Sequence, residues 1–232
     1  MRKYIMLWAI ISSLCFFTAC DEYDTEDISV EYSLDLTEGS NLIVQLGDPY
    51  SEPGYKAIYA GSDVTDKVVV EGAVDPNTVG LYMVEYSYTI PNGETISLER
   101  EVIVADMSIT TDISGTYVTQ EGTHRIRKGV RTDYSETEVV IKQIAPGFFS
   151  VSNLIGGYYS DHVGYGDRYA ASGYIQLKED NSIAILSSLV PGWGDSLSAL
   201  DNAAYTPADN TIYWEAGYAG MVFYVNMKMK EE

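Results

Sequence analysis

The sequence is poor in the side chains that most catalytic and metal-binding sites use. Its 232 residues include only two cysteines and two histidines, His124 and His162. It contains no paired-histidine metal motif, no Gly-x-Ser-x-Gly turn and no glycine-rich phosphate loop ending in Lys-Ser or Lys-Thr. We therefore expect neither a zinc hydrolase nor a serine hydrolase, and we predict that the protein is not an enzyme and uses no metal and no cofactor.

Basic residues are also scarce. The chain has 14 lysines and arginines against 34 aspartates and glutamates, which gives a formal net charge of -20. Such an excess of negative charge repels phosphate backbones, so nucleic acid is not an expected partner. Hydrophobic residues nevertheless make up 46% of the chain, which is typical of a folded protein and not of a disordered one.

Long hydrophobic runs are absent, with one short exception at the N-terminus. Residues 5–17 form an apolar run of 13 residues behind Arg2 and Lys3, too short for the roughly 20 residues of a membrane-spanning helix. The pattern predicts a secretory signal at residues 1–19. Its end, Phe17-Thr18-Ala19-Cys20, resembles the lipobox of bacterial lipoproteins, which implies lipidation of Cys20 and cleavage just before it. The alternative is a cleaved signal followed by a chance cysteine.

An acidic segment follows the predicted lipidation site. Residues 20–31 contain six acids and few apolar residues, so they are expected to form a solvated tether between the membrane and the folded protein. The order Cys20-Asp21-Glu22 followed by further acids also resembles the export signal of Bacteroidetes lipoproteins. This resemblance implies an outer-membrane protein that faces the cell exterior and contacts the membrane through its lipid anchor only.

Residues 32–106 predict a small all-β domain. In residues 80–88 the side chains of Tyr82, Val84, Tyr86 and Tyr88 share one face by period two, and a turn at residues 91–94 leads into a returning strand at residues 95–104. Shorter strands are expected at residues 42–46, 54–59 and 68–71. These tyrosines are interpreted as core and cross-strand packing.

Three stretches of this region carry a family resemblance. They are residues 48–57, which include Asp48-Pro49-Tyr50 and Glu52-Pro53-Gly54-Tyr55-Lys56-Ala57, the run Gly80-x-Tyr82-x-Val84-x-Tyr86, and Arg100-x-Val102-x-Val104-x-Asp106. Together they resemble the bacterial immunoglobulin-like domain of extracellular proteins. The resemblance implies an immunoglobulin-like β-sandwich at residues 32–106 that serves as a spacer or docking module.

After a short polar link at residues 105–112, residues 112–232 predict a second β-rich domain. Strands are expected at residues 115–121, 138–144, 148–154, 173–177, 182–190, 211–214 and 221–229, separated by turn signals. A spacing near ten residues favours a β-sandwich or a β-barrel, and no helix is required. Trp214 and Phe223 lie inside alternating strands and are expected in the core. The fold class of the whole chain is therefore all-β.

The second domain also resembles a known group, through Gly156-Gly157-Tyr158-Tyr159, Pro191-Gly192-Trp193-Gly194 and Thr211-Ile212-Tyr213-Trp214. These motifs are similar to the C-terminal domain of Bacteroidetes surface lipoproteins that accompany SusC/SusD-type outer-membrane nutrient importers. The resemblance implies an accessory role in glycan or peptide uptake, with the importer proteins as partners.

Five aromatic residues lie outside the alternating runs and form the predicted ligand-binding site. They lie among glycines of the segments 156–166 and 192–194, so their rings have little neighbouring bulk and are expected on exposed loops: Tyr158, Tyr159, Tyr165, Tyr169 and Trp193. Flat rings can stack on sugar faces or pack against a peptide, and exposed aromatic clusters commonly mark interaction sites. The alternative is a tyrosine-rich loop that only covers one end of its own domain.

Charged residues supply weaker candidates. Two carboxylates suffice for glycoside hydrolysis, and four lie in or beside the aromatic loops: Asp161, Asp167, Asp195 and Glu215. The acids of residues 201–209 match no calcium-loop pattern. Four basic residues fall within seven positions, where they can meet an acidic partner or a carboxylate ligand or simply form a solvated strand edge: Arg125, Arg127, Lys128 and Arg131.

The sequence thus predicts a lipid-anchored, non-enzymatic surface protein in which an immunoglobulin-like spacer carries a β-rich module that captures oligosaccharide or peptide for an importer. Two alternatives stay open: a purely structural importer subunit that binds no nutrient, and a glycosidase with paired carboxylates.

Overall fold

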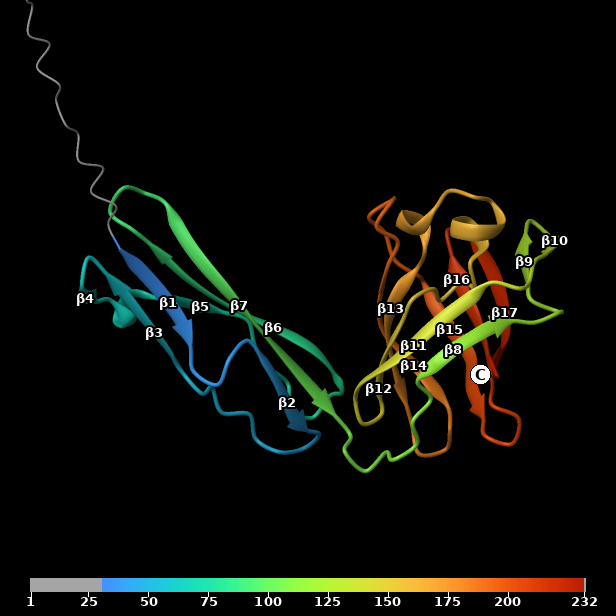
Figure 1. The fold of residues 1–232 in the computed structure, drawn as a ribbon, viewed down its shortest axis with the longest axis horizontal. Helices are drawn as coiled ribbons and strands as arrows, with labels where there is room; N and C mark the ends of the chain where they lie inside the picture. Colours follow the sequence, from blue (N-terminus) through green and yellow to red (C-terminus); the bar gives the residue numbers. More distant parts are fainter. Residues whose placement is uncertain (1–30, 232) are drawn as a thin grey trace, which may run out of the picture.

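The computed structural model describes residues 31–231 as two β-domains joined end to end (Figure 1). The predicted signal peptide, Cys20 and all of the predicted tether before Glu31 lie outside the described residues. No helix within the described part of the chain is long and apolar enough to cross a bilayer. The all-β prediction is confirmed, with three short helical turns as the exceptions to the expectation that no helix occurs.

The N-terminal domain is a sandwich of two sheets. One sheet has the order β1 (Tyr32–Leu36), β3 (Tyr55–Tyr59), β4 (Ser62–Asp63), and the other has the order β2 (Asn41–Gln45), β7 (Thr95–Ala105), β6 (Gly80–Thr89), β5 (Val69–Glu71). A helical turn, η1 (Thr65–Lys67), follows β4. Strand β2 pairs with β7 in parallel, and the other pairings are antiparallel.

The core of this domain follows the alternation predicted for β6. Val84, Tyr86 and Tyr88 are buried and pack with Leu34 of β1 and Ala57 of β3. Side chains alternate between the two faces of a strand, and paired residues on neighbouring strands point to the same face. The apolar residues at every second position of β6 therefore identify the face of its sheet that is packed against the core. The immunoglobulin-like sandwich expected at residues 32–106 is therefore the observed architecture.

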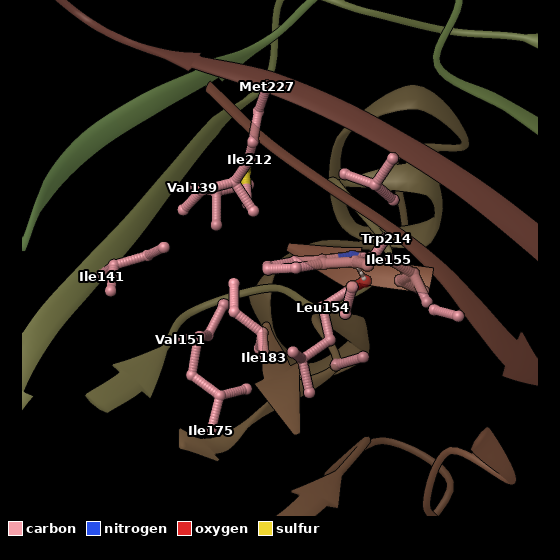
Figure 2. Close-up of a cluster of buried hydrophobic side chains, with 14 of the residues drawn as sticks. Val139, Ile141, Val151, Leu154, Ile155, Ile175, Ile183, Ile212, Trp214 and Met227 are labelled. Carbon is pink, nitrogen blue, oxygen red and sulfur yellow. Dashed lines mark hydrogen bonds between the residues drawn. The ribbon is translucent and has the colours of Figure 1, made fainter. Parts of the chain in front are cut away.

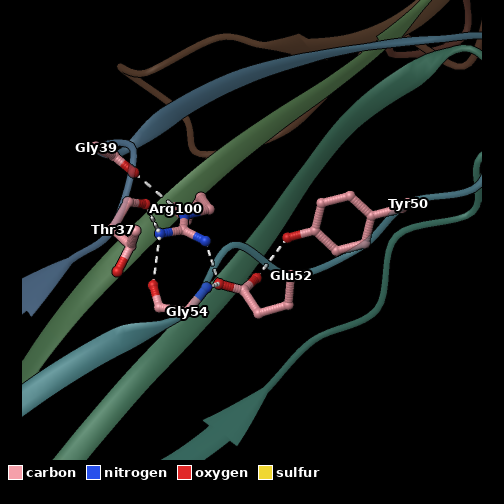
Figure 3. Close-up of polar contacts among 6 residues, drawn as sticks. All are labelled: Thr37, Gly39, Tyr50, Glu52, Gly54 and Arg100. Carbon is pink, nitrogen blue, oxygen red and sulfur yellow. Dashed lines mark hydrogen bonds and ion pairs between the residues drawn. The ribbon is translucent and has the colours of Figure 1, made fainter.

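An ion pair between a buried arginine and a partly exposed glutamate fastens the long connection between β2 and β3 (Figure 3). The Arg100 side chain in β7 is fully buried, pairs with the Glu52 carboxylate and donates through Nη2 to the carbonyl oxygens of Thr37 (2.7 Å) and Gly54 (3.1 Å). The hydroxyl of Tyr50 donates to the other carboxylate oxygen at 2.5 Å. Burial works to raise the pKa of Glu52, but hydrogen bonds and the Arg100 charge outweigh it, and the net pKa is lowered.

The C-terminal domain is one curled antiparallel sheet of ten strands. Its strands are β8 (Gly115–Thr119), β9 (His124–Arg127), β10 (Val130–Asp133), β11 (Glu138–Ala145), β12 (Phe148–Val151), β13 (Ser172–Leu177), β14 (Ile183–Leu189), β15 (Ala199–Thr206), β16 (Thr211–Tyr218) and β17 (Met221–Met229). One edge of β17 pairs with β16 and the other with β8 and β9. A bridge between Ser182 and Ala204 links the ends of β14 and β15, so the sheet curls towards a barrel.

The interior of the curled sheet is filled by apolar side chains from facing strands (Figure 2). Trp214 and Phe223 are fully buried there, as predicted. The indole nitrogen of Trp214 donates to the carbonyl oxygen of Leu154 at 2.7 Å, which satisfies its polar atom inside the core. Residues 31–231 contain no cysteine and therefore no disulfide, so packing of this kind is a main contribution to the stability of the domain.

Three features of the second domain differ from the predictions. The hairpin of β9 and β10 was not expected, because its strands carry arginines where alternation calls for apolar residues. Residues 199–206 form β15, a strand that was not among those expected, and Asp201 lies within it. The link at residues 105–112 is not purely polar: Ile109 is buried in the core of the second domain together with Ile113.

A small apolar junction joins the two domains. Ile103 and Ala105 at the end of β7 pack with Ala145 and Phe148 of the β11–β12 hairpin. Partly buried side chains surround this contact: Val79, Leu81, Tyr174 and Leu186. The junction lies at the end of the C-terminal domain that faces the immunoglobulin-like domain (Figure 1).

Candidate functional site

The predicted binding residues lie at the end of the C-terminal domain away from the junction, where two short helical turns are visible in Figure 1. The connection from β12 to β13 forms η2 (Tyr158–His162), a single π-helical turn, and η3 (Asp167–Tyr169), a 3-10 turn. The turn after β14, residues 190–195, lies beside η3. The amide of Gly192 in this turn donates to the carbonyl of Arg168 in η3 at 2.6 Å.

Two glycines make this arrangement possible. Gly157 has a φ of +80°, and a Cβ added there would lie 2.1 Å from the Thr137 side chain. A Cβ at Gly192 would lie 2.5 Å from the Tyr169 ring. Both positions therefore exclude larger residues, and the glycine-aromatic pattern seen in the sequence reflects close packing of the loops as well as open space around the rings.

The five predicted aromatic residues converge into one group, called here the aromatic cluster: Tyr158, Tyr159, Tyr165, Tyr169 and Trp193. The Trp193 ring centroid lies 4.8 Å from that of Tyr159 and 4.7 Å from that of Tyr169, both at tilted or edge-on angles. Tyr165 contacts Tyr169 at 5.4 Å and lies nearly parallel to Tyr159 at 6.1 Å. Such geometries are those that aromatic pairs prefer.

The members of the cluster differ in exposure. Tyr158 is buried at the base, where it contacts Tyr134 and Phe223. Tyr159 and Tyr169 are half-buried, while Tyr165 and Trp193 are 54% and 44% exposed. The outer rings are therefore available to a ligand, whereas Tyr158 supports them from below.

One further aromatic residue joins the cluster and was missed in the sequence. Tyr218 ends β16, its ring is stacked with Trp193 at 6.1 Å, and its hydroxyl donates to Asp195 at 2.7 Å. Burial and the hydrogen bond to Asp195 raise the pKa of Tyr218. The strand expected at residues 211–214 extends to Tyr218 in the structure, and the shorter prediction left Tyr218 out. The alternation of Trp214 and Ala216 continues to Tyr218 and indicates that its side chain faces inward.

The four clustered basic residues divide between the two faces of the β9–β10 hairpin. The guanidinium of Arg125 lies 4.7 Å above the centre of the Tyr158 ring, and its Nη2 donates to Thr132 at 3.1 Å. Arg131 is exposed and pairs with Asp133 at 2.6 Å. Arg127 is exposed at the end of β9, and Lys128 occupies the turn.

The four candidate carboxylates do not form one group. Asp161 and Asp167 line a cavity of about 400 Å³ beside Asn153 and Ser160. Asp195 accepts the Tyr218 hydroxyl, and Glu215 accepts the Tyr213 hydroxyl at 2.9 Å on β16. Within residues 31–231 no group of three or more histidine, cysteine, aspartate or glutamate side chains is arranged to hold a metal ion.

Comparisons with known proteins agree with this architecture. A family model described as a bacterial surface protein, Ig-like domain, matches residues 34–104, and a second model, described as a C-terminal domain, matches residues 106–229. The second match includes the segment with Ile109, which packs with the C-terminal core. The two matches define a bacterial surface protein with an immunoglobulin-like domain in front of a distinct β-domain.

A solved structure identifies the family more closely. The crystal structure of a lipoprotein from Bacteroides thetaiotaomicron is 36% identical, with a TM-score of 0.50, and the match covers 86% of this chain and 100% of that one. The chain belongs to the family of this Bacteroides lipoprotein and is a surface lipoprotein of two β-domains.

Other matches are distant. A Clostridium perfringens structure of CBM51-2 in complex with GlcNAc and INT domains is 15% identical over 52% of this chain and 29% of that one, with a TM-score of 0.28. A second structure from that organism, of an M60 catalytic domain with CBM51-1 and CBM51-2 domains, is 13% identical over 53% of this chain and 14% of that one, also with a TM-score of 0.28. A search of curated proteins found no match.

Proposed function

We propose that this lipoprotein is a non-enzymatic accessory component of a SusC/SusD-type nutrient importer and that its aromatic cluster captures oligosaccharide or peptide. The observation that carries the proposal is the convergence of Tyr159, Tyr165, Tyr169 and Trp193 from two separate loops onto one exposed end of the second domain. Clusters in which tyrosine and tryptophan stay exposed are typical of binding sites.

The arrangement suits reversible capture. Half-buried rings hold the exposed ones at fixed angles, so little conformational entropy is lost when a ligand stacks on them. The immunoglobulin-like domain then acts as the spacer between Cys20, the proposed lipid anchor, and the binding module. The lipid anchor at Cys20 would keep the site at the membrane without a spanning segment.

Calorimetry tests the capture step. The mature chain from Asp21 onward contains every described residue and is titrated with a panel of oligosaccharides and peptides, beside the Trp193→Ala variant. We expect binding of at least one class by the native chain and a loss of about tenfold or more in the variant. Failure to bind any panel member would overturn the capture role and favour the structural subunit as the alternative.

Two other experiments test the place of action. Purification of the anchored protein in mild detergent should recover the importer proteins with it. Protease shaving of intact cells should cleave a protein that faces the exterior, and a protein that stays intact until the cells are lysed would contradict that orientation.

A glycosidase is the weaker alternative. Among the four candidate carboxylates only Asp161 and Asp167 share a cavity, and the exposed rings of the aromatic cluster are not among the residues that line it. Turnover of a glycan that is abolished by Asp161→Asn or Asp167→Asn would overturn the non-enzymatic proposal.

A further inference from the structure

The inner face of the β9–β10 hairpin places positive charge beside the aromatic cluster. Arg125 lies opposite Phe223 in the pairing of β9 with β17, so both side chains are on the face that contacts Tyr158 and Tyr159. Arg127 is two residues further along β9 and therefore shares that face. The charge of Arg127 also acts on Tyr159, whose hydroxyl contacts the Met221 sulfur at 3.8 Å.

The two arginines retain unused hydrogen-bond donors. Nη2 of Arg125 donates to Thr132, whereas its Nε is buried and has no hydrogen-bond partner among the described residues. Arg127 is exposed and forms no ion pair within residues 31–231. A guanidinium offers five donors in a planar fork that matches a carboxylate. This local positive charge stands out on a chain whose formal net charge is -20.

Opposite charges lie at the two ends of the aromatic cluster. The arginines lie at the end formed by Tyr158 and Tyr159, while Asp195 lies at the end formed by Trp193 and Tyr218. Asp161 and Asp167 line the separate cavity with Asn153. A ligand on the exposed rings therefore meets cations at one end and a hydrogen-bond acceptor at the other.

From this juxtaposition we infer that the site is selective for an acidic oligosaccharide, one whose sugar ring stacks on the exposed aromatic residues while its carboxylate pairs with Arg127 and Arg125. The inference rests on the proposed function and adds the chemical class of the ligand. Hydroxyl groups at the far end of the ligand would donate to Asp195. We favour a sugar over a peptide because Tyr165 and Trp193 expose large parts of their rings, on which the apolar face of a pyranose ring can stack.

The test compares two ligands of equal length. The mature chain is titrated with an oligomer of hexuronic acid and with the neutral oligomer obtained by reduction of its carboxylates. We expect the acidic oligomer to bind about tenfold more tightly at low salt, with the preference decreasing as salt is raised. In the Arg127→Gln variant the preference for the acidic oligomer should fall to about threefold or less, because only Arg125 remains to pair with the carboxylate.

The hairpin supplies a matched control. Arg131→Gln removes one positive charge from the opposite face, since Arg131 pairs with Ile126 and not with Arg125 or Arg127. This variant should keep the preference. Equal binding of both oligomers by the native chain would overturn the inference and leave the capture role standing, whereas an absence of all binding would overturn the capture role itself. Tighter binding of an acidic peptide than of the uronate oligomer would also contradict it.

Discussion

Glu52 and Arg100 form an ion pair across 48 positions of the sequence, and this contact holds the connection between β2 and β3 against β7. The arginine is fully buried and the glutamate is about one-third exposed. Arg100 also donates to the backbone carbonyls of Thr37, Gly39 and Gly54. The motif Glu52-Pro53-Gly54 therefore acts as a structural clamp within the immunoglobulin-like domain.

Replacing Arg100 should destabilise the N-terminal domain strongly. Arg100→Met leaves the Glu52 carboxylate and three backbone carbonyls without their partner, and breaking a buried pair costs about 3 kcal/mol or more in the free energy of unfolding. Urea denaturation measures the loss. Glu99→Gln, one position earlier on an exposed site of β7, is the control and should change stability by less than about 0.5 kcal/mol. Equal effects of the two variants would contradict the clamp.

The same pair should make stability depend on acid. The pKa of Glu52 is lowered from its ordinary value of 4.5 in the folded state, so its ionised form stabilises the fold. This contribution is present above pH 4.5, where the unfolded chain is also ionised, and is lost as the pH falls through the lowered folded-state pKa. Denaturation between pH 7 and pH 3 should show a steeper loss for the native chain than for Glu52→Gln. Parallel curves would contradict the prediction.

Truncating a buried ring and an exposed ring of the aromatic cluster should have different effects on the stability of the fold. Tyr158→Ala removes a buried ring at the base, and we expect a loss of about 3 kcal/mol or more in the free energy of unfolding. Tyr165→Ala removes an exposed ring and should leave stability within about 0.5 kcal/mol of the native chain. Calorimetric unfolding measures both. If Tyr165→Ala unfolds as readily as Tyr158→Ala, the loop serves to cover the domain end.

Two glycines with the same backbone angle offer a direct test of loop packing. Gly157 and Gly164 both have a φ of +80°, but an added Cβ would meet Thr137 at 2.1 Å only at Gly157, with nothing within 4 Å at Gly164. Gly164→Ala should therefore cost only the backbone strain, about 1 kcal/mol. Gly157→Ala should cost at least about 2 kcal/mol more, because Thr137 must move. Similar unfolding temperatures for the two variants would contradict the prediction, because the β12–β13 connection would then accommodate the added Cβ without loss of stability.

Several elements could be predicted because their side chains alternate. Tyr82, Val84, Tyr86 and Tyr88 define β6, and Trp214 and Phe223 define the second core. The aromatic site could be predicted as a set of residues, since glycine-flanked rings seldom belong to regular strands. The geometry of the site could not be predicted, because the turn after β14 and η3 are distant in sequence and come together only in the folded chain.

Other elements carry no such signal. Strand β9 has Arg125 and Arg127 on its inner face, where the aromatic side chains of η2 replace the usual aliphatic core. Strand β15 is interrupted by a bulge between Asp201 and Ala204, which hides its alternation. Ile109 lies in a segment of polar composition, although it is buried in the second core against residues far along the chain. In each case the deciding neighbour is distant in sequence.

The position of the apolar junction has a mechanical consequence. Ile103 and Phe148 join the immunoglobulin-like domain to one end of the curled sheet. The two helical turns η2 and η3, which carry much of the aromatic cluster, lie at the other end (Figure 1). A partner bound to the immunoglobulin-like domain would therefore contact the molecule far from the aromatic cluster. Because the cluster lies at the distal end, any rotation about the junction would displace it further than it displaces the core between them.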